Sequence, residues 1–92
     1  MIQSFRCKDT LALYAGKHSR RFKALARVAE RKLAQLDAAQ TLAFLKAPPG
    51  NHLEALKDDR KGQHSIRISD QWRICFVWTE FGPAEIEIVD YH

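Results

Sequence analysis

Apolar and polar residues follow a helical period in the first half of the chain and a strand period in the second half. Between Phe22 and Leu36 the apolar positions recur at steps of three and four, which predicts one long amphipathic helix. Two shorter helices are expected, one from Asp9 to Gly16 and one from Asp37 to the proline pair that begins at Pro48.

Polar residues and glycines indicate where these helices begin and end. Asp9, Ser19 and Asp37 each precede a stretch with helical periodicity, so we expect them to be N-caps. Gly16 is well placed to end the first helix, and residues 48–50 (PPG) stop the last one.

The last third of the chain alternates with a period of two. Residues 64–69, 72–78 and 84–91 read as three strands joined by short turns, which is an antiparallel meander. Residues 2–6 fit a short N-terminal strand. The predicted fold is therefore an α+β two-layer domain, in which the N-terminal strand and two to three helices pack on an antiparallel sheet.

Alternation also assigns side chains to the two faces of this sheet. Arg67 and Arg73 should point out of the face that the helices leave open, and Tyr91 should join them. Asp90 and His92 fall on the other side, at the rim where the last strand ends. Four apolar residues should face the helices: Trp72, Ile74, Phe76 and Trp78.

The composition of the chain is typical of a globular protein, and we expect residues 1–92 to form a single domain. The chain has 92 residues, of which 46% are hydrophobic and 28% are charged. No apolar run approaches the roughly 20 residues of a membrane helix, and the first residues lack the apolar core of a secretion signal. The two cysteines form no metal-binding pattern and read as reduced thiols, so we expect a cytoplasmic protein without a membrane partner.

Positive charge is concentrated in two places. Lys and Arg number 15 against 11 acidic residues, for a net charge of +4. Seven basic residues and one acid lie between Lys17 and Lys32, and a second basic group runs from Lys57 to Arg73. This asymmetry favours a polyanionic partner. The alternative is a solvated surface whose asymmetry arose by chance.

The end of the chain carries residues suited to RNA cleavage by the 2′-hydroxyl. That reaction needs a base, a cation for the charged phosphorane and an acid for the leaving oxygen, and it needs no metal. Arg73 and Lys57 suit the cation role. His92 titrates near neutrality, Asp90 is a candidate base or orienting group, and Tyr91 is a candidate proton donor or stacking platform.

Other kinds of site find less support. His52, His64, Asp90 and His92 show no metal-ligand spacing, so we expect no metal. Nucleophile and phosphate-loop motifs such as GxSxG, GxGxxG and Walker loops are absent. Exposed arginines on a strand and a frayed terminal histidine remain ordinary alternatives to a catalytic role.

Several stretches resemble one known family over essentially the whole chain. They are VAERKLAQLDAA, the loop beginning APPGN, GQHSIRISDQWRICF and the terminal VDYH. They resemble the HigB branch of the RelE-like toxins of bacterial type II toxin–antitoxin systems. The resemblance implies a compact microbial-RNase-like fold and a metal-independent, cofactor-free endoribonuclease that cuts mRNA in the A site of the 70S ribosome. It also implies neutralisation by a HigA-type helix-turn-helix antitoxin, through which alone the protein would contact operator DNA.

The resemblance also indicates site residues. Arg67 matches a basic position of the wider RelE group, but the turn lengths differ there, so this match is weaker than those of the other positions. Arg60 lies in the same basic segment as Arg67. Some relatives have a histidine three residues before the matching lysine, where this chain has Glu54, a further candidate base. The positions that match residues used for RNA binding or cleavage are Lys57, Arg73, Asp90, Tyr91 and His92.

Two other functions use the same features. A non-enzymatic RNA-binding module would need only the basic surface, and a regulatory subunit would use the basic helix to contact a protein. The division of acid and base roles among Glu54, Asp90, Tyr91 and His92 stays open at this point.

Overall fold

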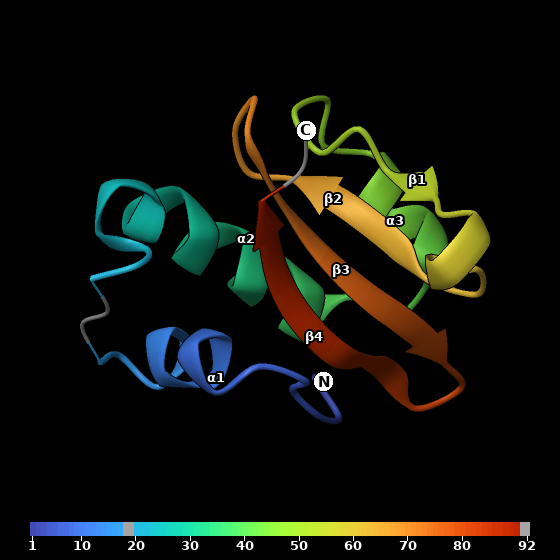
Figure 1. Ribbon diagram of the computed structural model, residues 1–92. Helices are drawn as coiled ribbons and strands as arrows, with labels where there is room; N and C mark the ends of the chain where they lie inside the picture. Colours follow the sequence, from blue (N-terminus) through green and yellow to red (C-terminus); the bar gives the residue numbers. More distant parts are fainter. Residues whose placement is uncertain (18–19, 91–92) are drawn as a thin grey trace.

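The computed structural model describes residues 1–17 and 20–90, and it confirms an α+β arrangement (Figure 1). Figure 1 shows α2 and α3 behind a twisted sheet, with α1 alongside β4. The helices are α1 (Lys8–Tyr14), α2 (Ala26–Ala38) and α3 (Leu42–Lys46), with single 3₁₀ turns η1 (Lys23–Leu25) and η2 (Asp58–Arg60). The strands are β1 (Glu54–Ala55), β2 (His64–Arg67), β3 (Trp72–Thr79) and β4 (Gly82–Asp90).

The sheet contains the predicted meander and one strand more. All neighbouring strands are antiparallel, in the order β1-β2-β3-β4. Strand β1 was not predicted, because it has two exposed residues and therefore no alternation to detect. It pairs Glu54 with Ser65 and Ala55 with His64, which folds the segment after α3 onto the edge of the sheet.

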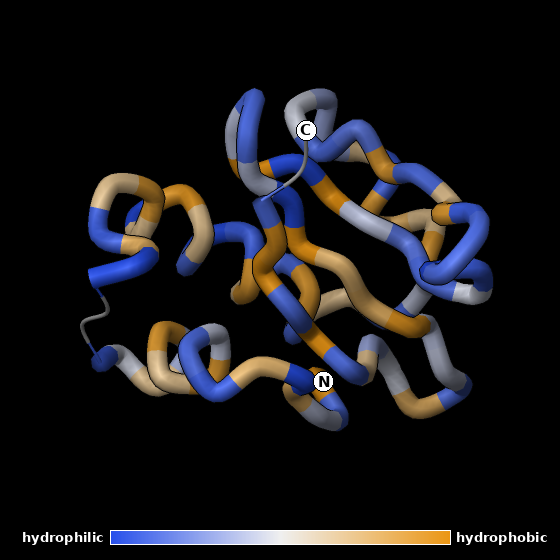
Figure 2. The backbone as a smooth tube through the Cα atoms, viewed as in Figure 1, coloured by the Kyte–Doolittle hydropathy of each residue, from blue (hydrophilic) through white to orange (hydrophobic). Residues whose placement is uncertain are grey.

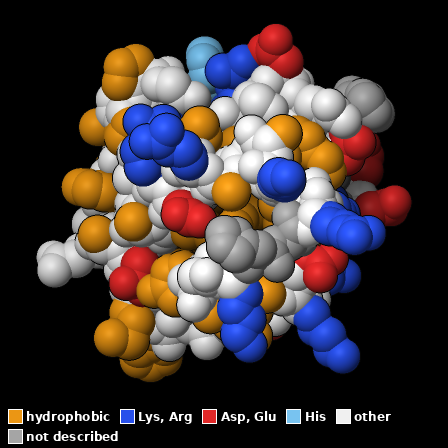
Figure 3. Space-filling view, turned by 90° about the vertical axis from the view of Figure 1, so that its left-hand side faces the viewer, with side chains coloured by type: hydrophobic (Ala, Val, Ile, Leu, Met, Phe, Trp, Pro, Cys, Tyr) orange, Lys and Arg blue, Asp and Glu red, His pale blue; other side chains and the backbone are white. Residues whose placement is uncertain are grey.

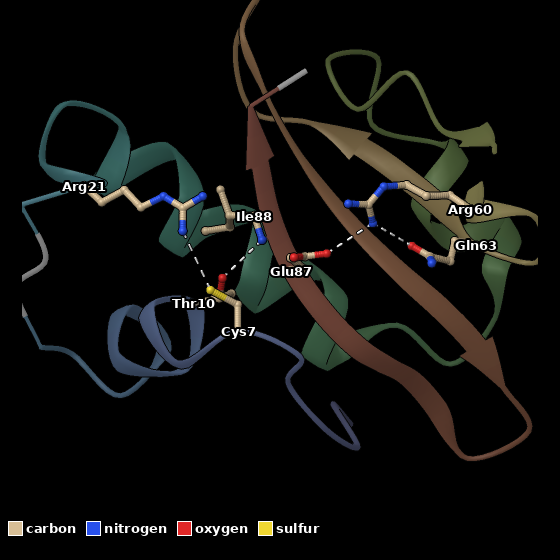
Figure 4. A network of polar contacts seen from close by, with 7 residues as sticks. All are labelled: Cys7, Thr10, Arg21, Arg60, Gln63, Glu87 and Ile88. Atoms are coloured by element: carbon tan, nitrogen blue, oxygen red, sulfur yellow. Dashed lines mark hydrogen bonds and ion pairs between the residues drawn. The ribbon is translucent and has the colours of Figure 1, made fainter. Parts of the chain in front are cut away.

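The prediction of an N-terminal strand at residues 2–6 is wrong, because these residues form no regular strand. The segment lies along the outer edge of β4 and forms one isolated parallel bridge, between Phe5 and Ile86. The Arg6 amide donates to the Ile86 carbonyl at 2.9 Å, and the Ile86 amide donates to the Ser4 carbonyl at 3.1 Å. Further along, the Ile88 amide donates to the hydroxyl of buried Thr10 at 3.1 Å (Figure 4).

The long helix begins later than its pattern predicts. Phe22 and Leu25 belong to the helical periodicity, but Phe22 precedes the 3₁₀ turn η1 and α2 begins only at Ala26. Both residues still serve the core, since Phe22 is fully buried and Leu25 packs against the core cluster. A 3₁₀ turn keeps apolar side chains on one side much as an α-helix does, so periodicity alone does not separate the two.

Two of the expected N-caps are wrong, and the third lies outside the described residues. Asp9 lies in the first turn of α1, after the N-cap Cys7. Asp37 lies inside α2, where its carboxylate accepts a hydrogen bond from the Ile2 amide at 2.9 Å. The cap of α3 is Thr41, whose hydroxyl accepts from the Phe44 amide at 3.2 Å. Ser19 is the position that the structure does not describe.

The core lies between the helices and one face of the sheet, where apolar residues concentrate (Figure 2). Trp72 and Trp78 are only partly buried and pack at its margin, so half of the predicted apolar face is peripheral. The Trp72 ring meets Phe22 edge-on at 5.7 Å. Fully buried side chains include Phe22, Leu33, Leu36, Ile66, Ile74, Phe76, Ile86 and Ile88.

Asn51 ties the loop after α3 to three elements. Its side chain is fully buried, and its amide nitrogen donates to the Leu45 carbonyl and to Gln35, both at 3.0 Å. Its side-chain oxygen accepts from the ammonium of Lys32 on α2. Its backbone carbonyl accepts from the Arg67 amide on β2 at 2.6 Å. One residue therefore holds α2, α3 and β2 in register with the loop.

We predict that Asn51→Ala lowers the free energy of unfolding by about 2–4 kcal/mol, because a buried carbonyl and a part-buried ammonium lose their partner. For a domain of this size the melting temperature should fall by at least about 8 °C. Thermal denaturation followed by circular dichroism measures the change. The matched control is Gln40→Ala at an exposed site, which should shift the melting temperature by only a few degrees. A loss below about 1 kcal/mol for Asn51→Ala would show that the network is not structural.

Candidate functional site

Strand register brings the polar side chains of the sheet into two rows on the face away from the helices. Directly paired residues of neighbouring strands share a face, so each row follows from the pairing. The first row contains Glu54, Ser65, Cys75 and Glu87. The second row contains Arg67, Arg73 and Val89. Alternation therefore assigned Arg67 and Arg73 to the same face, as the structure has them.

Arg73 is buried, which corrects the expectation that it points into solvent from an open face. Only 7% of the residue is exposed. Its Nε donates to the Ser65 hydroxyl at 2.7 Å, and one of its terminal nitrogens donates to the His52 carbonyl at 2.5 Å and to the Ser65 carbonyl at 3.3 Å. The segment that carries His52 folds back beside the strands, which alternation within β3 cannot reveal.

The His52 carbonyl is aimed at Arg73 by an unusual backbone conformation. His52 has a φ of 44°, in the left-handed region that residues with a side chain rarely adopt. Asn51 fixes the chain immediately before it, and Glu54 begins β1 two residues later. Asn51 and β1 on either side keep His52 in this unfavourable conformation. Its carbonyl therefore points at Arg73 and fixes one edge of the Arg73 guanidinium.

Arg60 covers the centre of the same face. It extends from η2 to β4, where its guanidinium donates to Glu87 at 3.1 Å, and it also donates to Gln63 at 3.1 Å (Figure 4). Glu87 pairs with Cys75, so the side chain of Arg60 reaches the strand positions around that thiol. Burial raises the pKa of the Cys75 thiol, and the positive charge of Arg60 only partly opposes this. The face predicted to be open is therefore covered at its centre, whereas Glu54 at its edge is exposed.

A hollow of about 270 Å³ adjoins this ion pair. Its lining carries guanidinium, carboxylate and amide groups, so it can donate and accept hydrogen bonds over a short distance. Such a mixed lining suits the edge of a nucleobase better than a bare phosphate. The residues that line it are Arg6, Asp59, Arg60, Gln63 and Glu87.

The remaining basic candidates lie at the margin of this face. Lys57 is exposed and directly precedes η2. Arg67 is half-buried and forms an ion pair with Asp70, whose side chain is 99% exposed. Water screens a pair of this kind, so it contributes at most about 1 kcal/mol and leaves Arg67 able to exchange partners.

The acidic candidates lie on opposite edges of the sheet. Glu54 is exposed on β1, and Asp90 is exposed at the end of β4. Asp90 pairs with Trp72 and accepts a hydrogen bond from Gln71 at 3.0 Å, which confirms its predicted place at the rim. Three strand spacings separate the two edges, or about 14 Å. Glu54 and Asp90 therefore cannot contact the same atom of a substrate.

Tyr91 and His92 lie outside the described residues, so their predicted sites stay predictions. Among the described residues, 1–17 and 20–90, no group of three or more His, Cys, Asp or Glu side chains is arranged to hold a metal ion. No helix in that part of the chain is long and apolar enough to cross a bilayer.

Four residues that position the site were not predicted: Lys32, Asn51, His52 and Ser65. Ser65 could have been found, since it alternates with Ile66 on a predicted strand and therefore shares the face of Arg73. The other three depend on contacts between distant segments. Burial of its ammonium lowers the pKa of Lys32, and the positive charges of Arg31 and Arg67 add to this.

Comparison with known proteins agrees with the resemblance seen in the sequence. The family model described as RelE-like toxin of type II toxin-antitoxin system HigB matches residues 4–92. Toxin HigB-1 of Vibrio cholerae is 48% identical over 62 residues, which cover 67% of this chain and 64% of that protein. An uncharacterized protein of Haemophilus influenzae is 35% identical over 63 residues, 68% of this chain and 62% of its own length. The matched part thus spans slightly less than two thirds of each relative.

We predict that only one of the two cysteines reacts quickly with a thiol reagent in the native protein. Cys7 is partly exposed, whereas Cys75 is buried beneath the Arg60 side chain with a raised thiol pKa. At pH 8 Cys75 should react at least about 100-fold more slowly, because it is both inaccessible and protonated. Absorbance with an aromatic disulfide reagent measures both phases, and Cys7→Ser should remove the fast one. A second fast thiol would mean that this face of the sheet is open.

Proposed function

Because the chain belongs to the HigB-like family of RelE-like toxins of type II toxin–antitoxin systems, we propose that it is a ribosome-dependent endoribonuclease that cleaves mRNA in the ribosomal A site. The observation that carries the proposal is Arg73. Arg73 is nearly buried and its guanidinium donates three hydrogen bonds, on a sheet face that also carries the charged residues Arg67, Glu54 and Glu87. A surface arginine that only served solubility would have no need of such restraint.

The proposed reaction is an attack of the 2′-hydroxyl on the adjacent phosphorus. The 2′-oxygen loses its proton to a base and bonds to phosphorus, the bond to the 5′-oxygen breaks, and an acid protonates that oxygen. The products are a 2′,3′-cyclic phosphate and a 5′-hydroxyl. Arg73 stabilises the charge that develops on the phosphorane, and its fixed position avoids reorganisation during the step.

The other candidates divide by their position. Arg67, which pairs with Arg73, and exposed Lys57 bind the phosphates on either side of the scissile one, and Arg60 binds the edge of a nucleobase in the hollow that it lines. Glu54 and Asp90 lie on opposite edges of the sheet, whose edge strands are about 14 Å apart. We therefore assign proton transfer to groups at one edge only, and we favour the Asp90 edge, where Tyr91 and His92 follow in sequence.

The proposal includes a partner. A HigA-type helix-turn-helix antitoxin binds the protein in the cytoplasm and blocks cleavage, and operator DNA is reached only through that antitoxin. Toxicity on expression, relieved by the protein encoded next door, is the cellular test of this part. If expression is harmless in cells that lack the neighbour, the toxin assignment fails.

We predict that Arg73→Lys and Ser65→Ala act on cleavage through one interaction. The lysine keeps the charge but cannot be held by the Ser65 hydroxyl and the His52 carbonyl together, so cleavage should fall about 100-fold. Ser65→Ala removes the hydroxyl that accepts from Nε, one of the three hydrogen bonds that hold the guanidinium, and should cost about tenfold. In the double variant the serine change should have no further effect, because residues in contact are not additive. Primer extension on mRNA in a translating extract measures the rates.

The matched control for this cycle is Lys61→Ala, which removes an exposed positive charge next to η2. It should alter cleavage less than threefold. Each variant is checked by urea unfolding, since Arg73→Lys leaves buried acceptors with poorer partners and should cost about 1–3 kcal/mol. Additive effects of Ser65→Ala and Arg73→Lys on the rate would refute the positioning role of Ser65.

We predict that removing residues 90–92 separates a nuclease from a simple RNA-binding module. The deletion removes the proposed acid and base groups but no lysine or arginine. RNA affinity in 100 mM salt should change less than threefold, because it depends on the remaining cations. Cleavage in the translating extract should fall below detection. A truncated protein that still cleaves would exclude Asp90, Tyr91 and His92 from the chemistry.

A further inference from the structure

The hollow beside the Arg60–Glu87 ion pair lies close to Arg73 along the strands. Glu87 of β4 pairs with Cys75 of β3, which follows Arg73 by two residues on the same sheet face. Two strand residues span about 7 Å, so a nucleotide adjacent to the scissile phosphate can reach the hollow. Arg60 extends from η2 across to β4, which brings the two halves of the ion pair together (Figure 4). The hollow is therefore placed to contact a base while Arg73 contacts the phosphate.

The ion pair leaves one hydrogen-bonding group unused on each of two side chains. One terminal nitrogen of Arg60 donates to an oxygen of Gln63 and to an oxygen of Glu87, both at 3.1 Å. Within residues 1–17 and 20–90, neither the second carboxylate oxygen of Glu87 nor the side-chain amide nitrogen of Gln63 forms a hydrogen bond. The hollow therefore offers an unused acceptor and an unused donor around one guanidinium nitrogen.

The rim of the hollow adds one further group of each charge. Asp59 of η2 supplies a second carboxylate, and Arg6, beside β4, supplies a second guanidinium. Both residues are exposed. The lining thus has two carboxylates, two guanidinium groups and one amide, and its formal charges cancel. A phosphate gains little from a lining without net charge, whereas an uncharged base can use both the donors and the acceptors.

Basic residues elsewhere on the surface are arranged differently. Figure 3 shows the side of the molecule on which α1 lies, where lysine and arginine side chains stand at several separate places on the surface. Separate cations can hold the RNA backbone, but they do not distinguish one base from another. Discrimination between bases needs donors and acceptors close together, as they are in the hollow.

We infer that the hollow binds guanine, and that a guanine next to the scissile phosphate favours cleavage. The inference rests on the proposed function, since it takes the substrate to be mRNA bound at Arg73. Guanine presents two donor nitrogens, N1 and N2, on its Watson–Crick edge and the acceptors O6 and N7 on its Hoogsteen edge. The unused oxygen of Glu87 and the Asp59 carboxylate accept from the two donor nitrogens, and the Gln63 amide donates to O6.

The other three bases match this lining less well. Adenine, cytosine and uracil each have one donor nitrogen on the Watson–Crick edge, so one of the two carboxylates would face an acceptor or lack a partner. Adenine is commonly recognised by the oxygen and the nitrogen of one Asn or Gln amide together. Gln63 cannot bind adenine in this way while its oxygen accepts from Arg60. Guanine is therefore the base whose donors and acceptors the hollow satisfies.

Messages that differ by single bases test the inference in a translating extract. One guanine is placed at the first, second or third position of a test codon, and each message is compared with messages that have adenine, cytosine or uracil there. The wild-type protein should cleave at least about tenfold faster with guanine at one of the three positions, which is the discrimination expected of one good bidentate contact. Differences below threefold at all three positions would overturn the inference.

Glu87→Gln tests the role of the carboxylate, because it keeps an oxygen for Arg60 but removes the second acceptor. The preference for guanine should fall below about threefold. The control, Glu80→Gln, makes the same chemical change at an exposed position between β3 and β4 and should keep the preference within twofold of the wild type. Thermal denaturation checks that both variants are folded. A Glu87→Gln protein with the full preference would show that the hollow does not select the base.

Free nucleotides give a measurement that needs neither the ribosome nor cleavage. In NMR titrations of the wild-type protein, GMP should shift the side-chain amide signals of Gln63 and should bind at least about fivefold more tightly than AMP. Both nucleotides carry the same phosphate, so the difference reports the base alone. Equal affinities, or binding of GMP that leaves the Gln63 signals unmoved, would overturn the inference.

The two proposals fail in different ways. If the wild-type protein binds GMP at Gln63 in preference to AMP but cleaves no mRNA in a translating extract, the nuclease is refuted and the base site stands. If it cleaves mRNA without regard to guanine and binds GMP no better than AMP, the base site is refuted and the nuclease stands.

Discussion

The buried amide of Asn51 is the constraint on which the rest of the site depends. It fixes the loop after α3 against α2 and β2, and the next residue, His52, is thereby held in a left-handed conformation. The His52 carbonyl then meets the guanidinium of Arg73. A side chain in a helix-to-strand loop thus helps to orient an arginine 22 positions later, through a connected set of hydrogen bonds.

Arg73 and Lys57 are both positively charged, but Arg73 is held in place whereas Lys57 is exposed to solvent. Arg73 exchanges hydration for fixed acceptors from Ser65 and His52, which costs desolvation but leaves its charge in one place. Lys57 is exposed and loses side-chain entropy whenever it meets a phosphate. Preorganised charge is most useful where charge develops during a reaction, whereas mobile cations suffice to attract a polyanion.

Strand alternation correctly assigned Arg67 and Arg73 to one sheet face and Asp90 to the rim, because the period of two is a local property of the backbone. It could not show that Arg73 is buried. That burial comes from residues 51–60, which form a two-residue strand and a single 3₁₀ turn and carry no periodic signal. The start of α3 was mispredicted for a similar reason. The carboxylate of Asp37 accepts a hydrogen bond from the distant Ile2 amide, and the hydroxyl of Thr41 caps α3 instead.

The outer edge of β4 has a consequence for how the chain behaves among other chains. Backbone groups along that edge form hydrogen bonds with residues near the N-terminus, namely Gln3, Ser4, Arg6 and Thr10. Strand β4 therefore presents few unpaired donors or acceptors there. At the opposite edge β1 contains two residues, which is too short to template a new strand. A four-stranded sheet closed at both sides in this way resists extension by a neighbouring sheet, and crowded copies of the protein gain little from stacking edge to edge.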